Sequence, residues 1–273
     1  MRIRFEETVA TPGWSIPAGA VISVSGIPSD SQLSRWLECG TIRIVRDPDA
    51  DLETPEGSQD FEKASTETRP FVPRLCPAGT VVCVATGPSL TADDVTYCRD
   101  KAFVIAINDA YRLAPWAGLV YGCDAKWWNW HKEVAKWPCL KFGLKAVDLN
   151  FPAGVALLEN TGITGLERKP TGLRNGKNSG YQAINVAVHL GASRILLLGY
   201  DMKLGPGGRS HFFGEHPDGL KPTISNFVGL FESIVEPLKK RHIEVVNCSR
   251  QTALTCFPRM PIEAALPVEA AVA

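Results

Sequence analysis

From residue 80 onward, short apolar runs rich in β-branched residues alternate with segments of helical periodicity. This alternation is typical of a mainly parallel sheet with helices on both faces. We therefore predict an α/β, Rossmann-like domain over residues 78–258. The expected strands are 81–85, 104–107, 195–198 and 243–246, with 119–122 as a further candidate, and the expected helices are 93–99, 180–190 and 224–241.

The regions on either side of this domain have a different character. Residues 1–46 contain alternating runs at 2–9, 21–25 and 41–45 and a capped segment at 31–38, which predict a small β-rich, SH3-like domain with one helix. Residues 47–77 are expected to form a linker, because 47–71 are rich in acidic residues, Ser, Thr and Pro. Residues 259–273 are predicted to form a C-terminal extension, loosely held from residue 262.

Composition narrows the classes of function. The 29 basic residues balance the 29 acidic ones, so no overall field attracts nucleic acid or an anionic membrane. No apolar run approaches the ~18 residues of a membrane span. We therefore expect a cytoplasmic protein that does not bind membranes. The balanced charge also argues against a nucleic acid partner. The eight cysteines form no C-x-x-C pair, which predicts buried free thiols rather than disulfides or a zinc site.

The strand at 81–85 leads directly into Thr86-Gly87-Pro88-Ser89-Leu90 and then into a capped helix. In open α/β sheets, ligands bind beyond the carboxyl ends of the strands, and glycine lets backbone N–H groups approach a phosphate. One interpretation is a phosphate or nucleotide cradle. The other is an ordinary strand-turn-helix connection shaped by Gly87 and Pro88, and spacing alone does not separate the two.

A second polar turn, Asn178-Ser179-Gly180, opens a predicted helix, and Asp201 follows the next strand. The fold brings a helix N-terminus and the end of the following strand towards the same edge. These residues are therefore candidates for donor binding, with Asp201 as a catalytic candidate. Alternatively, Ser179 caps its helix and Asp201 caps the following turn.

Three more acidic or amide side chains follow predicted strands, namely Asn108, Asp109 and Asp124. Each is a candidate for contacting a ribose, a base edge or a divalent ion. Asp124 and Asp201 are the candidates for Mg²⁺. The dense aromatic block 127–131 is interpreted mainly as core packing, with a stacking wall as the alternative.

A glycine-rich loop at 205–219 contains Arg209, His211 and His216. Such a loop suits a mobile lid that supplies a general base, His211 or His216, and a cation, Arg209, for developing negative charge. Metal binding by these histidines is less favoured, because no further ligand has suitable spacing.

Together these motifs resemble a superfamily defined by a strand ending in Gly-Pro-Ser-Leu, an Asn after the next strand, and a Ser-Gly helix followed by strand-Gly-x-Asp. It includes the archaeal MptE-like hydroxymethylpterin diphosphokinases, which use ATP and Mg²⁺, and bacterial sialyltransferases, which use a CMP-sugar. The resemblance covers about residues 78–258. It places on donor-binding positions Gly87, Pro88, Ser89, Asn108, Ser179 and Gly180, and it places His211 near the sialyltransferase base. Thr86 departs from the Asn usual in sialyltransferases.

Other segments resemble proteins encoded by tailed phages and prophages. These segments are 108–112, the Trp-rich block, 211–217 and 247–249, and residues 1–46 resemble a module of phage head proteins. The combined expectation is a phage-encoded, nucleotide-dependent glycosyl- or diphosphoryl-transferase acting on a small-molecule or glycan acceptor in the host cytoplasm. One alternative is a virion-associated structural or assembly protein that contacts capsid or neck proteins through 1–46. Another is a transferase that modifies phage DNA.

Overall fold

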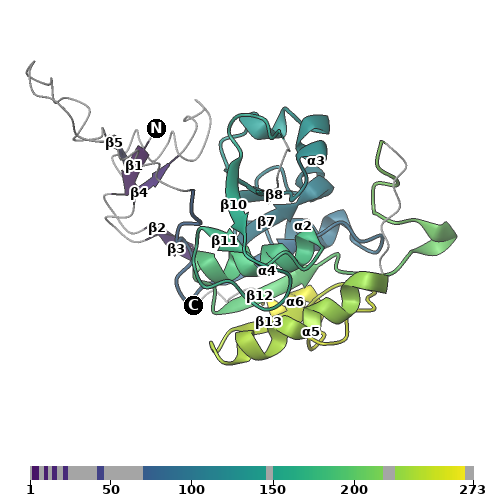
Figure 1. The fold of residues 1–273 in the computed structure, drawn as a ribbon. Coiled ribbons are helices and arrows are strands. Elements are labelled where there is room, and N and C mark those ends of the chain that lie inside the picture. Colours follow the sequence, from purple (N-terminus) through teal and green to yellow (C-terminus); the bar gives the residue numbers. More distant parts are fainter. Residues whose placement is uncertain are drawn as a thin grey trace, which may run out of the picture.

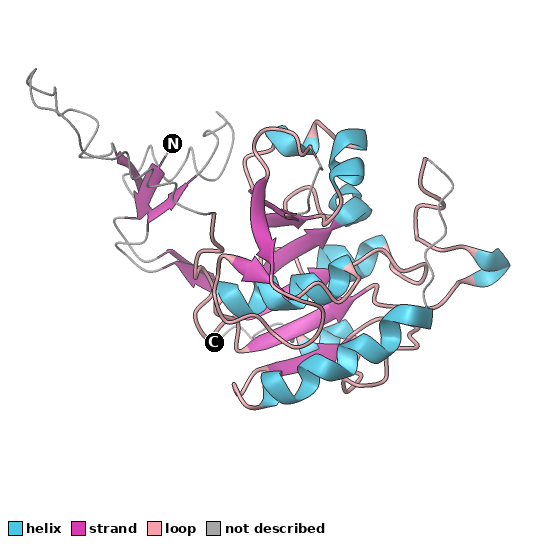
Figure 2. Ribbon diagram, viewed as in Figure 1, coloured by secondary structure: helices cyan, strands magenta, loops and turns pink. Residues whose placement is uncertain are grey.

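The computed structural model describes residues 2–5, 9–11, 14–16, 21–23, 42–45, 70–145, 150–217 and 225–267. Within residues 70–267, eight strands form one sheet in the order β11-β10-β9-β8-β7-β6-β12-β13 (Figures 1 and 2). All seven neighbouring pairs are parallel. The strands are β6 Thr80–Val84, β7 Phe103–Ile107, β8 Leu119–Tyr121, β9 Leu140–Leu144, β10 Ala156–Asn160, β11 Gly172–Leu173, β12 Arg194–Leu198 and β13 Glu244–Asn247. The predicted α/β Rossmann-like fold is confirmed.

The order of the strands reverses beside β6. From β6 the chain adds β7 to β11 one after another on one side, and it then returns to place β12 on the other side of β6, with β13 beyond it. In sheets of this kind, the point of reversal leaves a crevice at the carboxyl ends of the two strands concerned. The topology therefore directs attention to the segments that follow β6 and β12.

The five predicted strands all exist, whereas β9, β10 and β11 were not predicted. Their sequences carry polar residues or glycine that weaken a strand pattern, as in Leu-Lys-Phe-Gly-Leu for β9. Lys141 of β9 is nevertheless buried, and its ammonium group donates hydrogen bonds to the carbonyls of Trp137 and Cys139. Burial of a lysine is tolerated here because backbone oxygens replace its water.

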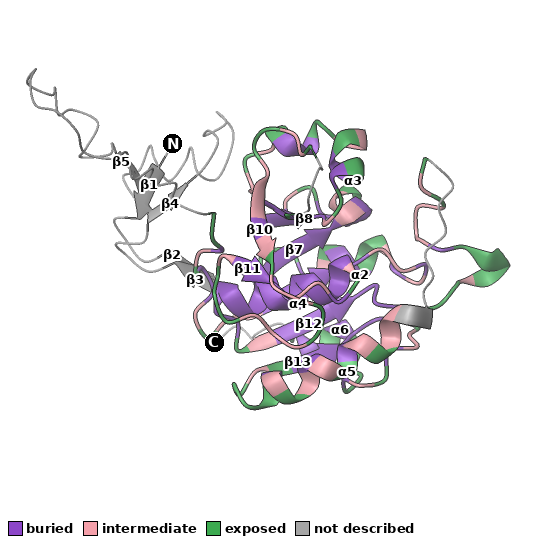
Figure 3. Ribbon diagram, viewed as in Figure 1, coloured by how far each residue is buried: buried purple, intermediate pink, exposed green. Residues whose placement is uncertain are grey.

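Helices cover both faces of the sheet, as Figure 3 shows by the buried strands between them. Along β6, Val81 and Cys83 belong to the cluster that contains α4 and α5, whereas Val82 and Val84 belong to the cluster that contains α2, α3 and α6. The helices are α2 Ala92–Tyr97, α3 Ala125–Trp130, α4 Ser179–Leu190, α5 Ser225–Lys239 and α6 Ile262–Ala265, with 3₁₀ turns η2 Asn108–Arg112, η3 Val134–Lys136 and η4 Pro206–Gly208. In the described parts of the chain, no helix is long and apolar enough to cross a lipid bilayer.

Helix α4 is buried along its whole length, since every one of its residues is buried. It ends at Gly191, whose φ of 96° is in the left-handed region that glycine tolerates. Two of its polar side chains reach neighbouring segments inside the core. Gln182 accepts a 2.7 Å hydrogen bond from the Tyr121 hydroxyl, and Asn185 Oδ1 accepts one of 2.8 Å from the Glu167 backbone N–H.

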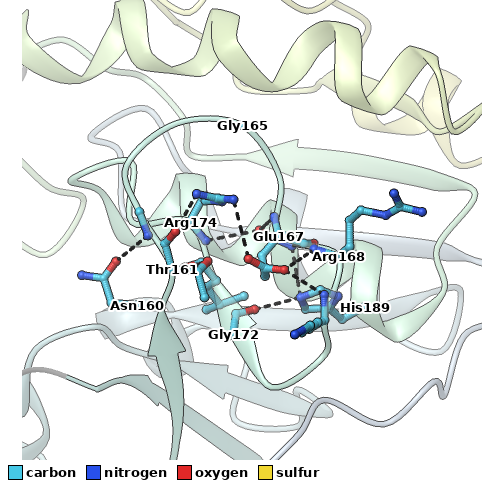
Figure 4. Close-up of polar contacts among 12 residues, drawn as sticks. Asn160, Thr161, Gly165, Glu167, Arg168, Gly172, Arg174 and His189 are labelled. Carbon is cyan, nitrogen blue, oxygen red and sulfur yellow. Dashed lines mark hydrogen bonds and ion pairs between the residues drawn. The ribbon is translucent and has the colours of Figure 1, made fainter.

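The segment between β10 and α4 is organised around Glu167 (Figure 4). Its Oε1 accepts hydrogen bonds from the backbone N–H groups of Arg168 and Lys169, at 2.8 and 3.0 Å. Its other oxygen lies 3.8 Å from the Arg174 guanidinium. These contacts, the Lys169 N–H foremost, lower the pKa of Glu167 to about 2. The Glu167 carboxylate thus holds the loop over α4, and its charge is balanced by Arg174 and by the backbone N–H groups of the same loop.

Both predicted domain boundaries need adjustment. Val72 and Cys76, expected in the linker, are buried in the core, and Cys76 N–H donates to the carbonyl of Leu190 at 2.8 Å. At the other end, Ile262 and Leu266 are buried, and the Tyr97 hydroxyl donates to the Leu266 carbonyl at 3.0 Å. The prediction of a loosely held tail from residue 262 is therefore wrong for 262–266, because apolar side chains there complete the α2 side of the core.

In the N-terminal region, β1 Arg2–Phe5 pairs antiparallel with both β4 Val21–Ser23 and β5 Ile42–Val45. The strands β2 Val9–Thr11 and β3 Trp14–Ile16 pair with each other. The predicted strand at 2–9 is thus divided between β1 and β2. The predicted helix at 31–38 lies outside the described residues, and the SH3-like classification stays a prediction.

The seven cysteines in the described ranges are free thiols. All seven have raised pKa values because burial disfavours the thiolate, for example about 12 for Cys83. Those ranges also contain no group of three or more acidic, His or Cys side chains placed to hold a metal ion.

We expect Glu167→Gln to lower the free energy of unfolding at neutral pH. The folded-state pKa of about 2 lies below the ordinary value of 4.5, so the stabilisation is complete above about pH 4.5 and is lost as the pH falls towards 2. Urea unfolding at pH 7 and pH 3 should show a smaller difference between variant and wild type at pH 3. Glu133→Gln, in an exposed pair with Lys136, is the control, and an equal effect of both variants would contradict this role.

Candidate functional site

A pocket of about 510 Å³ lies at the carboxyl edge of the sheet, where the strand order reverses. Its walls come from the segments after β6, β7, β8 and β12, from the start of α4, from residues 210–216 and from α5. The structure brings together eleven of the predicted site residues here: Thr86, Gly87, Pro88, Asn108, Asp124, Asn178, Ser179, Gly180, Asp201, His211 and His216. Three predicted residues, Ser89, Asp109 and Arg209, do not line it.

The Gly-Pro-Ser-Leu loop is bonded to the end of β12 rather than open to a ligand. Gly87 N–H donates to the Gly199 carbonyl at 2.8 Å, and Ser89 N–H donates to Asp201 Oδ2 at 2.7 Å. Leu90 N–H donates back to Gly87, and Pro88 has no N–H. Three amides of the loop are therefore already used inside the protein, which favours the interpretation as a strand-turn-helix connection over the cradle. The loop forms a wall of the pocket instead.

Gly87 is required by close packing. A Cβ atom at this position would lie 2.3 Å from Asp201 Oδ1 and 2.5 Å from the Gly199 carbonyl oxygen. No side chain fits without separating the two strand ends. Gly199 itself has a φ of 68° and faces the Ala85 carbonyl, so the approach is tight from both sides.

Asp201 holds this loop in place. Besides the bond from Ser89 N–H, its Oδ1 accepts a 2.9 Å hydrogen bond from the Ser89 hydroxyl. The side chain is 2% exposed, and burial raises the pKa of the carboxyl group. Because both oxygens are committed to Ser89, the geometry supports a positioning role better than the predicted catalytic or Mg²⁺-binding one. Asp124, the other Mg²⁺ candidate, is exposed at the pocket.

The start of α4 is capped by a residue other than the one expected. Asn178, not Ser179, provides the cap, since its side-chain oxygen accepts from the N–H groups of Gly180 and Tyr181 at 2.8 and 3.2 Å. The Ser179 hydroxyl instead donates to Cys123 Sγ at 3.1 Å. Asn178, Ser179, Gly180 and Cys123 all line the pocket, so this turn both begins the helix and forms part of the site.

His211 is held by the loop that follows β6. Its Nδ1 lies 3.0 Å from the Thr86 hydroxyl, and its ring stacks on Phe213 with centroids 4.9 Å apart. Burial, assisted by the charge of nearby His216, lowers the pKa of His211 to about 4. The imidazole is therefore uncharged near neutral pH.

His216 lies in front of a buried carboxylate. Its Nδ1 is 4.0 Å from Oδ2 of Asp109, whose side chain is 1% exposed. That carboxylate also accepts a 2.8 Å hydrogen bond from the Trp127 indole and pairs with Arg112 at 2.7 Å. Asp109 thus contributes behind the pocket wall, through His216, rather than by the direct ligand contact that was expected.

The aromatic block divides between the two interpretations. Trp127 and Trp128 are 3% and 0% exposed and belong to the core, as expected for most of the block. Trp130 is half-buried and lines the pocket, with the Lys126 ammonium 5.3 Å from its ring and His216 5.8 Å away. Trp127 also borders the cavity, so both indoles face it and the half-buried Trp130 is the more accessible of the two.

Sequence reasoning missed three lysines at the pocket, Lys126, Lys177 and Lys203. Each lies within two residues of a predicted site residue, which is the signal that could have found them. They supply the positive charge that was assigned to Arg209, which is exposed and outside the pocket lining.

Three pocket residues have left-handed backbone conformations although they are not glycine. They are Asn108, Lys177 and Met202, with φ values of 50°, 55° and 47°. Such conformations cost of order 1 kcal/mol or more and gather at functional sites, where the surrounding structure imposes them. Their coincidence at one pocket supports this edge as the functional one.

Comparisons with known proteins leave the family open. No model of a known protein family matches the chain, and no curated protein matches its sequence. Among solved structures, it is similar to a MAf glycosyltransferase from Magnetospirillum magneticum AMB-1, with 13% identity and a TM-score of 0.49. The match covers 72% of this chain and 36% of that one. A likeness this distant carries no information about the reaction.

We predict that His211 stays uncharged at pH 6. In an NMR titration of the imidazole signals, assigned with His211→Gln, its midpoint should lie near 4, below the ~6.5 of an unperturbed histidine. Because the folded pKa is the lower one, native stability should decline as the pH falls from about 6.5 towards 4, and less so in the variant. A midpoint at or above 6.5 would contradict the buried placement.

For Asp201, we expect Asn and Ala substitutions to differ. Asp201→Asn keeps an oxygen for Ser89 N–H and an amino group for the Ser89 hydroxyl, whereas Asp201→Ala leaves both unpaired. The Ala variant should lose about 1–3 kcal/mol of unfolding free energy and the Asn variant much less. Equal losses in denaturant titrations would show that the charge, not the hydrogen bonding, is what matters.

Proposed function

We propose that the chain is a nucleotide-dependent group transferase whose donor, a CMP-sugar or ATP, binds in the pocket beside β6 and β12. The observation that carries the proposal is the composition of this pocket at the point where the strand order reverses. Three lysines, a half-buried indole and two histidines line one cavity of about 510 Å³. That volume lies within the ~300–1,000 Å³ typical of small-molecule sites.

The lysines are suited to the donor's phosphates. Lys126 lies on α3, Lys177 precedes α4 and Lys203 follows β12, so positive charge reaches the cavity from three segments. Of the two acids in the lining, Asp201 is bonded to Ser89 and Asp124 is exposed. Ammonium groups therefore take the part that backbone N–H groups play in glycine-rich phosphate loops.

Further polar groups are available to the rest of the donor. Ser210 is 4% exposed and lines the pocket, and its hydroxyl has no hydrogen-bond partner among the described residues. Buried polar atoms are normally paired, so a ligand atom is the natural partner for it. The Asn108 amide and the Trp130 ring offer hydrogen bonding and stacking for the ribose or base. Mg²⁺ carried in by the donor's phosphates would meet Asp124.

His216 is our candidate for the general base. In the proposed step, the acceptor hydroxyl oxygen attacks the transferred glycosyl carbon or phosphorus, the bond to the nucleotide phosphate breaks, and the hydroxyl proton passes to His216. Its Nδ1 lies 4.0 Å from the buried Asp109 carboxylate, which is placed to orient the imidazole towards the cavity. His211 has a pKa of about 4, which makes it a weak base, and its ring is bonded to the Thr86 hydroxyl. The virion-associated and DNA-modifying alternatives rest on the resemblance alone.

The test is a thermal-shift panel of CMP, CDP, UDP-sugars, ATP and AMP, each with and without Mg²⁺. We expect one nucleotide class to raise Tm, and Lys177→Gln or Lys203→Gln to weaken its binding about tenfold or more, as expected for a lost charge-assisted contact. Lys136→Gln, which removes a lysine paired with Glu133 outside the pocket, should have no effect. No shift with any nucleotide would overturn the proposal.

A further inference from the structure

A second hollow, which we call the basic groove, lies between the loop after β10 and the end of α5. It has a volume of about 650 Å³ and is lined by Leu166, Arg168, Pro237, Lys240 and Arg241. Every charged residue in this lining is basic. The chain as a whole is neutral, so this is a local concentration of charge rather than a general property of the surface.

The nearest acid does not neutralise Arg168. Glu167 directs its carboxylate at the backbone N–H groups of Arg168 and Lys169 and at Arg174. Figure 4 shows the Arg168 guanidinium extending away from this cluster. Within the described residues, the side chains of Arg168, Lys240 and Arg241 make no hydrogen bond or ion pair.

The two walls are fixed relative to each other. Gly165 N–H donates to the Ser233 hydroxyl of α5 at 3.1 Å, and the Tyr181 hydroxyl bonds to both Gly165 and Ser233 at 2.9 Å. Glu167 N–H is tied to Asn185 of α4. The backbone that carries Arg168 is therefore held in place by buried hydrogen bonds, while its charged end stays available.

The basic groove is separate from the donor pocket. Helix α4 begins at the pocket, and its last turn carries His189, which bonds to Gly172 at 2.9 Å beside the Glu167 loop. Twelve residues of helix separate these ends by about 18 Å. Lys240 and Arg241 also complement the C-terminal dipole of α5, but that role does not account for Arg168 on the opposite wall.

We propose that the basic groove binds a compact anion that carries two or more phosphate groups. Guanidinium groups suit phosphate because they donate paired hydrogen bonds in a fixed geometry. The cations come from both walls of one hollow, which fits a small ligand. A nucleic acid strand generally needs a longer track of contacts, on the order of six to ten phosphates.

Calorimetric titration of the full chain with pyrophosphate tests this proposal. Pyrophosphate is expected to bind the groove, and also the donor pocket if its lysines bind phosphate. Arg168→Gln/Arg241→Gln should weaken groove binding about tenfold or more, while Lys177→Gln/Lys203→Gln should leave it unchanged. If wild-type protein bound pyrophosphate in the groove but showed no binding that depends on Lys177 and Lys203, the result would count against the proposed function and not against the groove.

The matched control is Lys239→Gln, which removes an adjacent lysine that is paired with Glu236 and lies outside the groove lining. Unchanged pyrophosphate binding in Arg168→Gln/Arg241→Gln would overturn the proposal, as would an equal loss in Lys239→Gln. A single-stranded oligonucleotide that binds the groove far more tightly than pyrophosphate would also overturn it, in favour of a nucleic acid partner.

Discussion

The ends of β6 and β12 are locked together by hydrogen bonds from Gly87 and Ser89 to Gly199 and Asp201. This contact joins the loop after β6 to the segment after β12 at the point where the strand order reverses. The pocket walls extend from it on both sides. Residues 205–212 also depend on it, since Phe212 N–H donates to the Thr86 carbonyl and Gly205 approaches Pro88 closely. A buried carboxylate and a glycine without room for a side chain therefore determine the shape of the site.

Helix α4 extends from the donor pocket to the loop beside the basic groove. Its first residues line the donor pocket, and its last turn supports the loop that carries Arg168. The helix is buried along its whole length and makes side-chain hydrogen bonds to strands and loops on the way. Both candidate sites are thus mounted on one rigid element, at its opposite ends.

Much of this arrangement follows from sequence pattern. The buried runs at 81–85 and 195–198 predict central strands, and parallel topology brings the polar residues that follow them to one edge. The pattern could not show that the Gly-Pro-Ser-Leu amides are already bonded, because their acceptors, Gly199 and Asp201, are more than a hundred residues away. It also could not assign Trp130 to the pocket and Trp128 to the core, since these nearby indoles differ only in their direction on α3. The outer strands were missed because they are short or carry polar residues.

The most direct test is a crystal structure of the protein with the nucleotide that gives the strongest thermal shift. The account predicts density in the pocket beside β6 and β12, with phosphates within hydrogen-bond distance of Lys177 or Lys203 and the Ser89–Asp201 bonds intact. A nucleotide bound elsewhere would contradict the account. So would phosphates resting on the N–H groups of Gly87 and Ser89 after those bonds had opened.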